Sequence, residues 1–301
     1  MEIQDYTDSE FKLALERNLR SLTRGKKSNK QPIAILLGGQ SGASKTTIHR
    51  IKQKEFQGNI VIIDGDSFHS QHPHYLELQQ EYGKDSVEYT KDFAGKMVES
   101  LVTELSYLGY NLLIEGTLRT IDVPKETAQL LKSKGYEVQL ALIATKPKLS
   151  YLSTLIRYEE LYAINPNQAR ATPKEHHDLV VGLLPKNADT VFLSDKANVF
   201  KVYSREGLIF DSRIHQGQMP SAAIDHELHR NTRRLKSLEA DMEQRSHLLS
   251  DFQKQVVAGA EKLIANLPPA DQIQAKINLY SSQLQSLDKH PEQDADIEID
   301  R

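Results

Sequence analysis

Short apolar runs alternate along this chain with longer segments whose apolar side chains recur every three or four positions. The runs have the length and the β-branched content of buried strands, and they cover residues 33–37, 60–63, 112–114, 138–143 and 199–203. Helical spacing fills the intervals, over residues 45–54, 89–108, 125–133 and 149–162. Such alternation is typical of βαβ units, so the pattern predicts an α/β domain with a mostly parallel sheet and helices on both faces.

The pattern changes after residue 216. From Ile224 onward, apolar residues follow alternating steps of four and three, as in a heptad seam, until Pro268-Pro269 ends the stretch. The seam comprises Ile224, Leu228, Leu235, Leu238, Met242, Leu249, Phe252 and Val256, with Asn231 and Arg245 as polar interruptions. We therefore predict one domain over residues 1–215 and an α-helical extension over residues 216–301, built as a helical hairpin or as a long helix with a partner. The segment from His290 onward is acidic and is predicted to be disordered.

Composition narrows the possible functions. The 301 residues are 39% hydrophobic and 26% charged, which is ordinary for a globular protein, and the net charge of −3 lacks the basic excess of a non-specific nucleic-acid binder. The absence of cysteine excludes disulfides and thiolate–metal sites. Neither a leader-like start nor a stretch of roughly 20 apolar residues is found, so we expect a cytoplasmic protein without a membrane or nucleic-acid partner.

The most informative stretch follows the first predicted strand and opens the first predicted helix. Against the phosphate-binding pattern G-x-x-x-x-G-K-[ST], Gly39, Lys45 and Thr46 fit. Backbone N–H groups of such a loop bind the β-phosphate, the lysine reaches the β and γ oxygens, and the threonine hydroxyl binds Mg²⁺. The predicted nucleotide-binding residues are Gly39, Gln40, Ser41, Gly42, Ala43, Ser44, Lys45, Thr46 and Thr47.

Ser44 departs from this pattern, which has glycine at its position. A Cβ and a hydroxyl there either disturb the backbone dihedrals of the loop or are tolerated, with the hydroxyl bonding a phosphate. We expect nucleotide binding that is weakened but present. The alternative is a glycine-rich turn without a ligand.

Acidic residues follow the next two strands of the predicted sheet. Asp64 and Asp66 come after residues 60–63, and Glu115 comes after residues 112–114. Because the carboxyl ends of parallel strands share one edge, these side chains are expected beside the phosphate-binding loop. Asp66 suits a base for an acceptor hydroxyl, Glu115 suits a residue that orients Mg²⁺-bound water, and Asp64 either shares the role of Asp66 or serves in the turn. The alternative is that both aspartates only cap the turn.

Phosphoryl transfer also needs cations around the γ-phosphate. Arg157 falls on the predicted helix over residues 149–162, and Arg170 falls in residues 165–173, which have the composition of a lid loop between two helices. The alternative for each is an ordinary surface arginine. Together these features predict a phosphotransferase that moves the terminal phosphoryl group of ATP or GTP onto a hydroxyl of a small molecule.

These residues resemble the zeta toxin family, and the likeness runs from Met1 to about residue 178. The matching segments are residues 39–42, 45–47, 64–68, 71–73, 114–119, 155–158 and 165–173. The resemblance implies a P-loop kinase-like domain that phosphorylates the 3′-hydroxyl of UDP-N-acetylglucosamine and so blocks cell-wall synthesis. It further implies a small helical antitoxin of the epsilon type, whose N-terminal helix blocks the nucleotide site.

The resemblance also assigns roles to individual residues. Asp66 is the base, while Lys45, Arg157 and Arg170 stabilise the γ-phosphoryl group. The sugar nucleotide is bound by Glu99, Thr117, Arg119 and Thr127, with Glu115 near the acceptor and the metal.

Two other functions stay open at this point: a kinase for another acceptor, such as shikimate, a nucleoside or a polynucleotide end, and a catalytically silent protein that binds a nucleotide or an antitoxin. The extension over residues 216–301 departs from the family pattern. Three roles stay open for it: a coiled-coil surface for a partner, an inhibitory element or scaffold.

Overall fold

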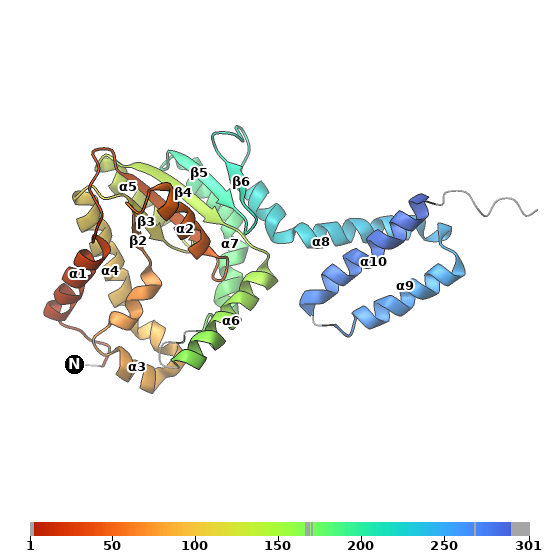
Figure 1. Cartoon of the computed structure of the whole chain (residues 1–301), viewed down its shortest axis with the longest axis horizontal. Coiled ribbons are helices and arrows are strands. Elements are labelled where there is room, and N and C mark those ends of the chain that lie inside the picture. The colour runs from red at the N-terminus through yellow and green to blue at the C-terminus, as the bar shows by residue number, and fades with distance from the viewer. Residues whose placement is uncertain (1–2, 166–168, 170, 268, 290–301) are drawn as a thin grey trace, which may run out of the picture. The chain divides into compact units, whose positions relative to one another are not determined.

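A six-stranded sheet forms the centre of the first part of the molecule (Figure 1). The computed structural model describes residues 3–165, 169, 171–267 and 269–289. The strands lie in the order β2-β3-β1-β4-β5-β6, and only β6 is antiparallel to its neighbour. Their bounds are β1 Ile33–Gly39, β2 Val61–Ile63, β3 Leu112–Glu115, β4 Glu137–Ile143, β5 Val199–Tyr203 and β6 Leu208–Asp211. The predicted α/β class and the five predicted strands are confirmed, whereas the short β6 was not predicted.

Helices cover both faces of this sheet. Alternate residues of β1 face opposite sides, so that Leu36 joins a large core beneath α1, α4, α5 and α7, while Leu37 joins a smaller core beneath α2. The helices are α1 Asp8–Leu22, α2 Lys45–Glu55, α3 Tyr75–Tyr82, α4 Val87–Tyr107, α5 Asp122–Ser133, α6 Pro147–Ile164 and α7 Lys174–Leu193. Two 3₁₀ helices, Gly65–Gln71 and Gly83–Ser86, lie before and after α3. The carboxyl edge of the sheet thus lies among the loops that follow β1, β2 and β3.

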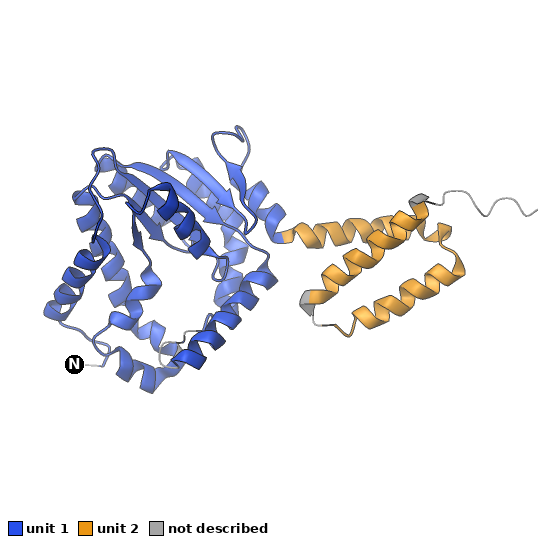
Figure 2. Cartoon of the chain, viewed as in Figure 1, with its two compact units in different colours: residues 1–228 blue, residues 229–301 orange. Residues whose placement is uncertain are grey.

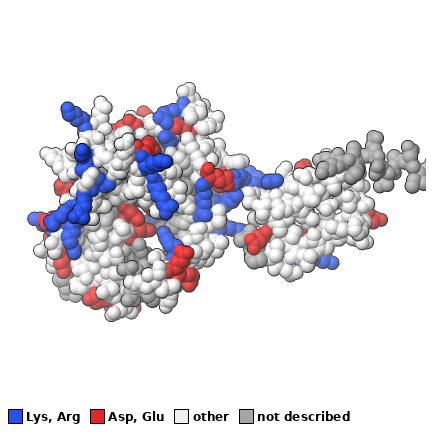
Figure 3. All heavy atoms as spheres, viewed as in Figure 1, with Lys and Arg blue, Asp and Glu red and all other residues white. Residues whose placement is uncertain are grey.

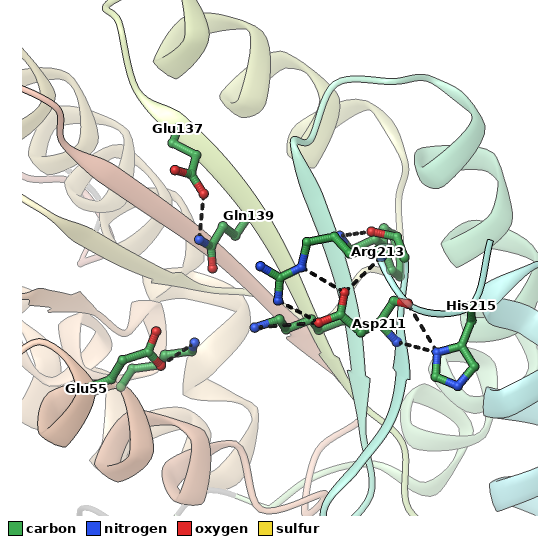
Figure 4. A network of polar contacts seen from close by, with 10 residues as sticks. Glu55, Glu137, Gln139, Asp211, Arg213 and His215 are labelled. Atoms are coloured by element: carbon green, nitrogen blue, oxygen red, sulfur yellow. Dashed lines mark hydrogen bonds and ion pairs between the residues drawn. The ribbon is translucent and has the colours of Figure 1, made fainter.

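The strand β6 ends in a buried carboxylate that anchors the edge of the sheet (Figure 4). The two oxygens of Asp211 accept from Nε and Nη2 of Arg213, at 3.1 and 2.8 Å, and Nζ of Lys201 on β5 lies 3.9 Å away. The hydrogen bonds from Arg213 lower the pKa of Asp211 to about 2. This carboxylate therefore ties β6 and the segment that follows it to β5.

The chain divides into two compact units, residues 1–228 and 229–301 (Figure 2). The division falls later than the predicted boundary at residue 215, inside helix α8 Pro220–Arg245. The first turns of α8 belong to the first unit because Ile224 and Leu228 are buried in its large core. On the face of the first unit seen in Figure 3, lysines and arginines are interspersed with acidic side chains, in keeping with the nearly neutral net charge.

The second unit contains the rest of α8, a 3₁₀ turn Ser246–Leu248, and the helices α9 Asp251–Ile264 and α10 Pro269–Lys289. Its core comprises Leu235, Met242, Leu249, Ile277, Tyr280 and Leu284. The predicted helical extension is confirmed, but the heptad seam does not continue through one helix. Ser250 starts α9 with a capping box to Gln253, and the chain changes direction there. The acidic segment from His290 onward lies outside the described residues.

In the part of the chain that the structure describes, we find no helix of the length and apolar content that a membrane span requires.

Candidate active site

The loop between β1 and α2 has a backbone that needs glycine at two positions. Gly39 and Gly42 have φ of +142° and +72°. A Cβ on Gly39 would lie 2.4 Å from the carbonyl oxygen of Ile143, and one on Gly42 would lie 2.0 Å from that of Ser150. The loop therefore packs directly against the end of β4 and the first turn of α6. It leads into the N-terminus of α2, whose first amides have no partner within the helix and can bind an anion.

Ser44 adopts the left-handed conformation that the glycine of the pattern would adopt. Its φ is +79° and its ψ is +38°, and its side chain makes no capping hydrogen bond to α2. A non-glycine residue in this region is strained because its Cβ crowds the backbone. The serine thus occupies the loop in a strained conformation, at an energetic cost.

Three hydrogen bonds tie this loop to other segments of the chain. The buried Gln40 donates through Nε2 to the carbonyl of Thr145, whose hydroxyl donates in turn to the carbonyl of Ala43 at 3.1 Å. Arg205, in the turn between β5 and β6, donates through Nη2 to the carbonyl of Gly42 at 2.5 Å. These three hydrogen bonds use none of the N–H groups of the loop, which is the part of such a loop that binds a phosphate. Arg205 was not predicted, since no local sequence pattern marks a contact over 163 positions.

The loop lysine meets the acidic end of the third strand. Nζ of Lys45 donates to the carbonyl of Gly39 at 3.1 Å and lies 3.6 Å from Oε1 of Glu115. The other carboxylate oxygen of Glu115 lies 2.8 Å from Nε2 of His49. His49 was missed by the sequence analysis, although its position one turn after Lys45 puts both side chains on one face of α2. This arrangement places a cation and a carboxylate where a nucleotide and its metal ion would bind.

A cavity of about 280 Å³ gathers several of the predicted site residues. Lys45 comes from α2, Asp66 from the 3₁₀ helix after β2, and Glu115 and Thr117 from the end of β3. The remaining wall is formed by Ser41, Gly65, His69, Lys91, Ala94, Gly95, Val98, Gly116 and His176. We call this space the catalytic cavity. The expected convergence of the two strand ends beside the phosphate-binding loop is therefore present.

The two aspartates after β2 have different environments. Asp64 caps the 3₁₀ helix, because its Oδ1 accepts from the N–H of Asp66 at 3.1 Å. Burial raises the pKa of Asp64, and the negative charges of Glu115 and Asp66 raise it further. Asp66 instead has an exposed side chain at the wall of the catalytic cavity. The turn role considered from the sequence applies to Asp64, whereas the carboxylate of Asp66 is open to the catalytic cavity.

A magnesium ion fits this donor set. Burial is the main cause of the raised pKa of Asp64, and the negative charges of Glu115 and Asp66 add to it, so a cation would relieve the part that comes from repulsion. The hydroxyl of the exposed Thr46, at the start of α2, is the side-chain ligand expected in a phosphate-binding loop. No cluster of three or more His, Cys, Asp or Glu ligands occurs among the described residues. The ion would therefore be held mainly by Thr46, phosphate oxygens and water, with Glu115 acting on the water.

A second, larger cavity of about 500 Å³ lies against the first and shares Val98, Glu115, Gly116 and Thr117 with it. We call it the acceptor cavity. It contains the four residues that the family resemblance assigned to the sugar nucleotide, which are Glu99, Thr117, Arg119 and Thr127. Its other walls are largely apolar, from strands β1, β3 and β4 and helices α4 and α5. A few polar groups on an apolar wall are typical of a small-molecule site.

The segment after β3 is held in a strained conformation between the two cavities. Leu118 is a non-glycine residue with φ of +59°. The side-chain amide of Asn187, on α7, donates to the carbonyls of Leu118 and Arg119 at 2.9 Å each. Strain that a buried hydrogen bond maintains is common at binding sites, where it fixes neighbouring side chains. Asn187 thus positions Thr117 and Arg119, a role that no local sequence signal indicates.

Of the two predicted catalytic arginines, the structure describes only Arg157. Arg157 is exposed on α6 and belongs to the lining of neither cavity. Arg170 lies outside the described residues, together with residues 166–168 of the predicted lid loop. The roles of both arginines stay predictions.

Comparisons with known proteins confirm the resemblance seen in the sequence. The family model described as Zeta toxin matches residues 18–215. Toxin PezT of Streptococcus pneumoniae serotype 4 is 80% identical over 214 residues, which cover 71% of this chain and 85% of that toxin. Toxin zeta of Streptococcus pyogenes is 42% identical over 229 residues, which cover 76% of this chain and 80% of that toxin.

A solved structure agrees with these matches. It comes from the molecular and structural characterization of the PezAT chromosomal toxin–antitoxin system of Streptococcus pneumoniae. It superimposes with a TM-score of 0.69 at 71% identity, and it covers 76% of this chain and 90% of that chain. The family match ends at residue 215, before α8 begins.

Proposed function

The chain belongs to the zeta toxin family and has a P-loop kinase-like fold, and from this we propose that it transfers the γ-phosphoryl group of ATP or GTP to the 3′-hydroxyl of UDP-N-acetylglucosamine. The observation that carries the proposal is the meeting of Lys45, Asp66 and Glu115 in one cavity that adjoins a second, larger one. A donor and an acceptor need such adjoining spaces if their reacting oxygens are to meet in line.

The predicted catalytic residues have separate roles in this reaction. Asp66 accepts the proton of the acceptor hydroxyl while the hydroxyl oxygen attacks the γ-phosphorus. The bond between the γ-phosphorus and the β–γ bridging oxygen breaks, and the nucleoside diphosphate leaves. Lys45 balances charge on the β and γ oxygens. Thr46 would hold a Mg²⁺ ion, which would supply further positive charge beside the phosphates. Arg157 on α6 and Arg170 stabilise the charge of the γ-phosphoryl group, which are the roles that the family resemblance assigns to them.

The acceptor cavity suits a nucleotide sugar in size and chemistry. A volume of about 500 Å³ lies within the range of sites for ligands of this size. Arg119 supplies a cation for a diphosphate, while Glu99, Thr117 and Thr127 supply acceptors and hydroxyls for a sugar and a base. Phosphorylation of this precursor would withhold it from cell-wall synthesis, and we expect the protein to act in the cytoplasm, where this precursor is made.

We also propose a small helical antitoxin of the epsilon type as the partner that blocks the nucleotide site. The solved relative belongs to a toxin–antitoxin system, which supports such a partner. The helix α6 offers a surface beside the loop, because its Ser150 carbonyl adjoins Gly42 while several of its apolar side chains are exposed. These are Leu149, Leu152, Leu155, Ile156, Leu161, Tyr162 and Ile164.

The test is direct. The protein is incubated with γ-labelled ATP, Mg²⁺ and UDP-N-acetylglucosamine, and the products are separated by mass. A labelled sugar nucleotide with one added phosphate is expected, whereas shikimate, nucleosides and 5′-hydroxyl oligonucleotides should stay unlabelled. Transfer to one of these instead would replace the acceptor, and nucleotide binding without any transfer would favour the silent alternative that Ser44 raises.

A further inference from the structure

The carboxylate of Glu115 is shared between two side chains of α2, and neither of the two contacts is a complete hydrogen bond. Its Oε1 lies 3.6 Å from Nζ of Lys45, which is longer than a hydrogen bond. Its Oε2 lies 2.8 Å from Nε2 of His49, but the two groups are not aligned as a hydrogen bond requires. The carboxylate therefore stands between a lysine and a histidine without being fully engaged by either.

All three side chains are shielded from water. The exposed fractions of the side chains of Lys45, His49 and Glu115 are 12%, 11% and 14%. Nε2 of His49 is buried and has no aligned hydrogen-bond partner among the residues that the structure describes. A buried polar atom of this kind costs free energy, and such atoms are few in folded proteins. Its place beside a carboxylate therefore points to a bond that another state of the site completes.

The position of His49 directs its ring toward the acidic edge of the sheet. His49 follows Lys45 by four residues on α2, so both side chains share one face of the helix. Burial, and next the charge of Glu115, raise the pKa of Asp64, whereas His49 acts on that pKa in the opposite direction. His49 thus lies near two of the carboxylates that follow β2 and β3.

A bound triphosphate changes the surroundings of Glu115. In a phosphate-binding loop the lysine places its ammonium group on the β and γ oxygens, so Lys45 turns away from the carboxylate. A shielded carboxylate that loses its counter-charge is unfavourable unless another donor replaces it. His49 has that donor, since an ionised carboxylate only accepts and the facing Nε2 must carry the proton.

We propose that His49 is a positioning residue, which takes over the carboxylate of Glu115 when Lys45 binds the phosphates. Its N–H then donates to Glu115, holds that carboxylate at the wall of the catalytic cavity and leaves Lys45 free for the nucleotide. The role rests on the proposed function only as far as the nucleotide is concerned. It does not depend on which hydroxyl accepts the phosphoryl group.

The first experiment measures the affinity of the full chain for ATP without metal, by calorimetric titration in EDTA. His49→Leu keeps a side chain of similar volume without a donor, and it should bind ATP about tenfold more weakly than the parent, because Lys45 would leave a shielded carboxylate unpaired. His49→Gln places an amide N–H near the position of Nε2 and should remain within about twofold of the parent. Equal affinities of the parent and His49→Leu would overturn the proposal.

The Glu115→Gln background determines whether the effect passes through Glu115. Its amide has no charge to be held, so the addition of His49→Leu should change the affinity for ATP by less than about twofold. Urea unfolding of the same variants accompanies the titrations, since a loss of packing alone would weaken binding equally in both backgrounds. A loss of about tenfold in the Glu115→Gln background as well would make His49 a packing residue and contradict the proposal.

The second experiment measures phosphoryl transfer to UDP-N-acetylglucosamine in the presence of Mg²⁺. In His49→Leu the KM for ATP should rise about tenfold, while kcat falls less and the KM for the sugar nucleotide stays the same. A lower kcat with an unchanged KM for ATP would assign His49 to the chemical step and overturn the positioning role. If the parent transfers nothing to this acceptor, the proposed function fails, and the titrations in EDTA still decide the role of His49. A parent that binds no ATP would refute both.

Discussion

At the scale of single residues, the site combines positions that the sequence marks with positions that it does not. Lys45, Asp66 and Glu115 could be predicted because a loop motif and two strand ends define one edge of a parallel sheet. Arg205 and Asn187 could not, since their hydrogen bonds reach the site over 163 and 69 positions and depend on the finished fold. The consequences of Ser44 and Asp66 can be tested most directly.

Replacement of Ser44 by glycine is expected to stabilise the protein by about 1 kcal/mol, because it removes the strain of a Cβ at φ +79°. Nucleotide affinity should rise as well, since the loop would no longer resist small adjustments around the phosphates. Urea unfolding and calorimetric titration with ATP and Mg²⁺ measure the two effects. Gly42→Ala is the matched control, and it should do the reverse because Ser150 blocks its Cβ. A Ser44→Gly protein that is less stable than the parent would contradict this account.

The Asp66→Asn variant is expected to lose phosphoryl transfer by a factor on the order of a hundred to ten thousand, as for removal of a general base. Nucleotide binding should change little, because Asp66 lies at the cavity wall and not in the phosphate-binding loop. Single-turnover transfer and equilibrium binding of ATP separate the two quantities. The Asp64→Asn variant serves as the comparison, since that carboxylate caps the 3₁₀ helix. A larger loss of transfer for Asp64→Asn than for Asp66→Asn would reverse the assignment.

At the scale of secondary-structure elements, periodicity predicted the strands β1 to β5 and the helices α2, α4, α5 and α6, but it did not predict α3 and it failed in two further places. The strand β6 has only four residues, too few for a period to emerge, and pairing with β5 defines it. The heptad spacing continues across Ser250 although the helix does not, because the capping box of Ser250 with Gln253 overrides the apolar pattern. Local capping and tertiary pairing thus decide where elements end.

The anchor of β6 gives a prediction about pH. The folded pKa of Asp211, about 2, lies below its ordinary value of 3.8, so its ion pair stabilises the fold above pH 4 and ceases to do so as the pH falls through about 2. The Asp211→Asn variant should be less stable than the parent by about 1–2 kcal/mol at neutral pH, given that Arg213 is largely exposed. Urea unfolding at several pH values measures the difference, which should narrow between pH 4 and 2. A difference that is constant with pH would rule out the ionised carboxylate as its source.

At the scale of the whole molecule, the position of the boundary between the units matters more than the composition of the extension. The predicted boundary at residue 215 followed the change in sequence pattern. The structure instead retains the first turns of α8 in the first unit, where the N–H of Ser221 also donates to Asp189 at 2.8 Å. The change in sequence pattern marks where the heptad spacing begins. It does not mark where the core of the first unit ends, because that core includes Ile224 and Leu228.

Truncation distinguishes these two boundaries. A protein of residues 1–228 should fold with the stability of the first unit, whereas one of residues 1–215 should lose several kcal/mol. The reason is that Ile224 and Leu228 each contribute about 1.5–3 kcal/mol on burial. Thermal and urea unfolding of the two proteins give the comparison, and the double variant Ile224→Ala/Leu228→Ala of the longer protein is the control. Equal stability of the two truncated proteins would favour the boundary at residue 215.

The buried amide of Gln40 has a consequence for how the molecule responds to its nucleotide. Gln40 bonds the start of α6 through Thr145, and Ser150 of α6 pairs with Nε2 of His177 on α7 at 2.8 Å. A chain of hydrogen bonds therefore connects the phosphate-binding loop to α6 and α7, the two helices that flank Arg170 in the sequence. A triphosphate that stiffens the loop is therefore expected to stiffen the first turns of both helices as well.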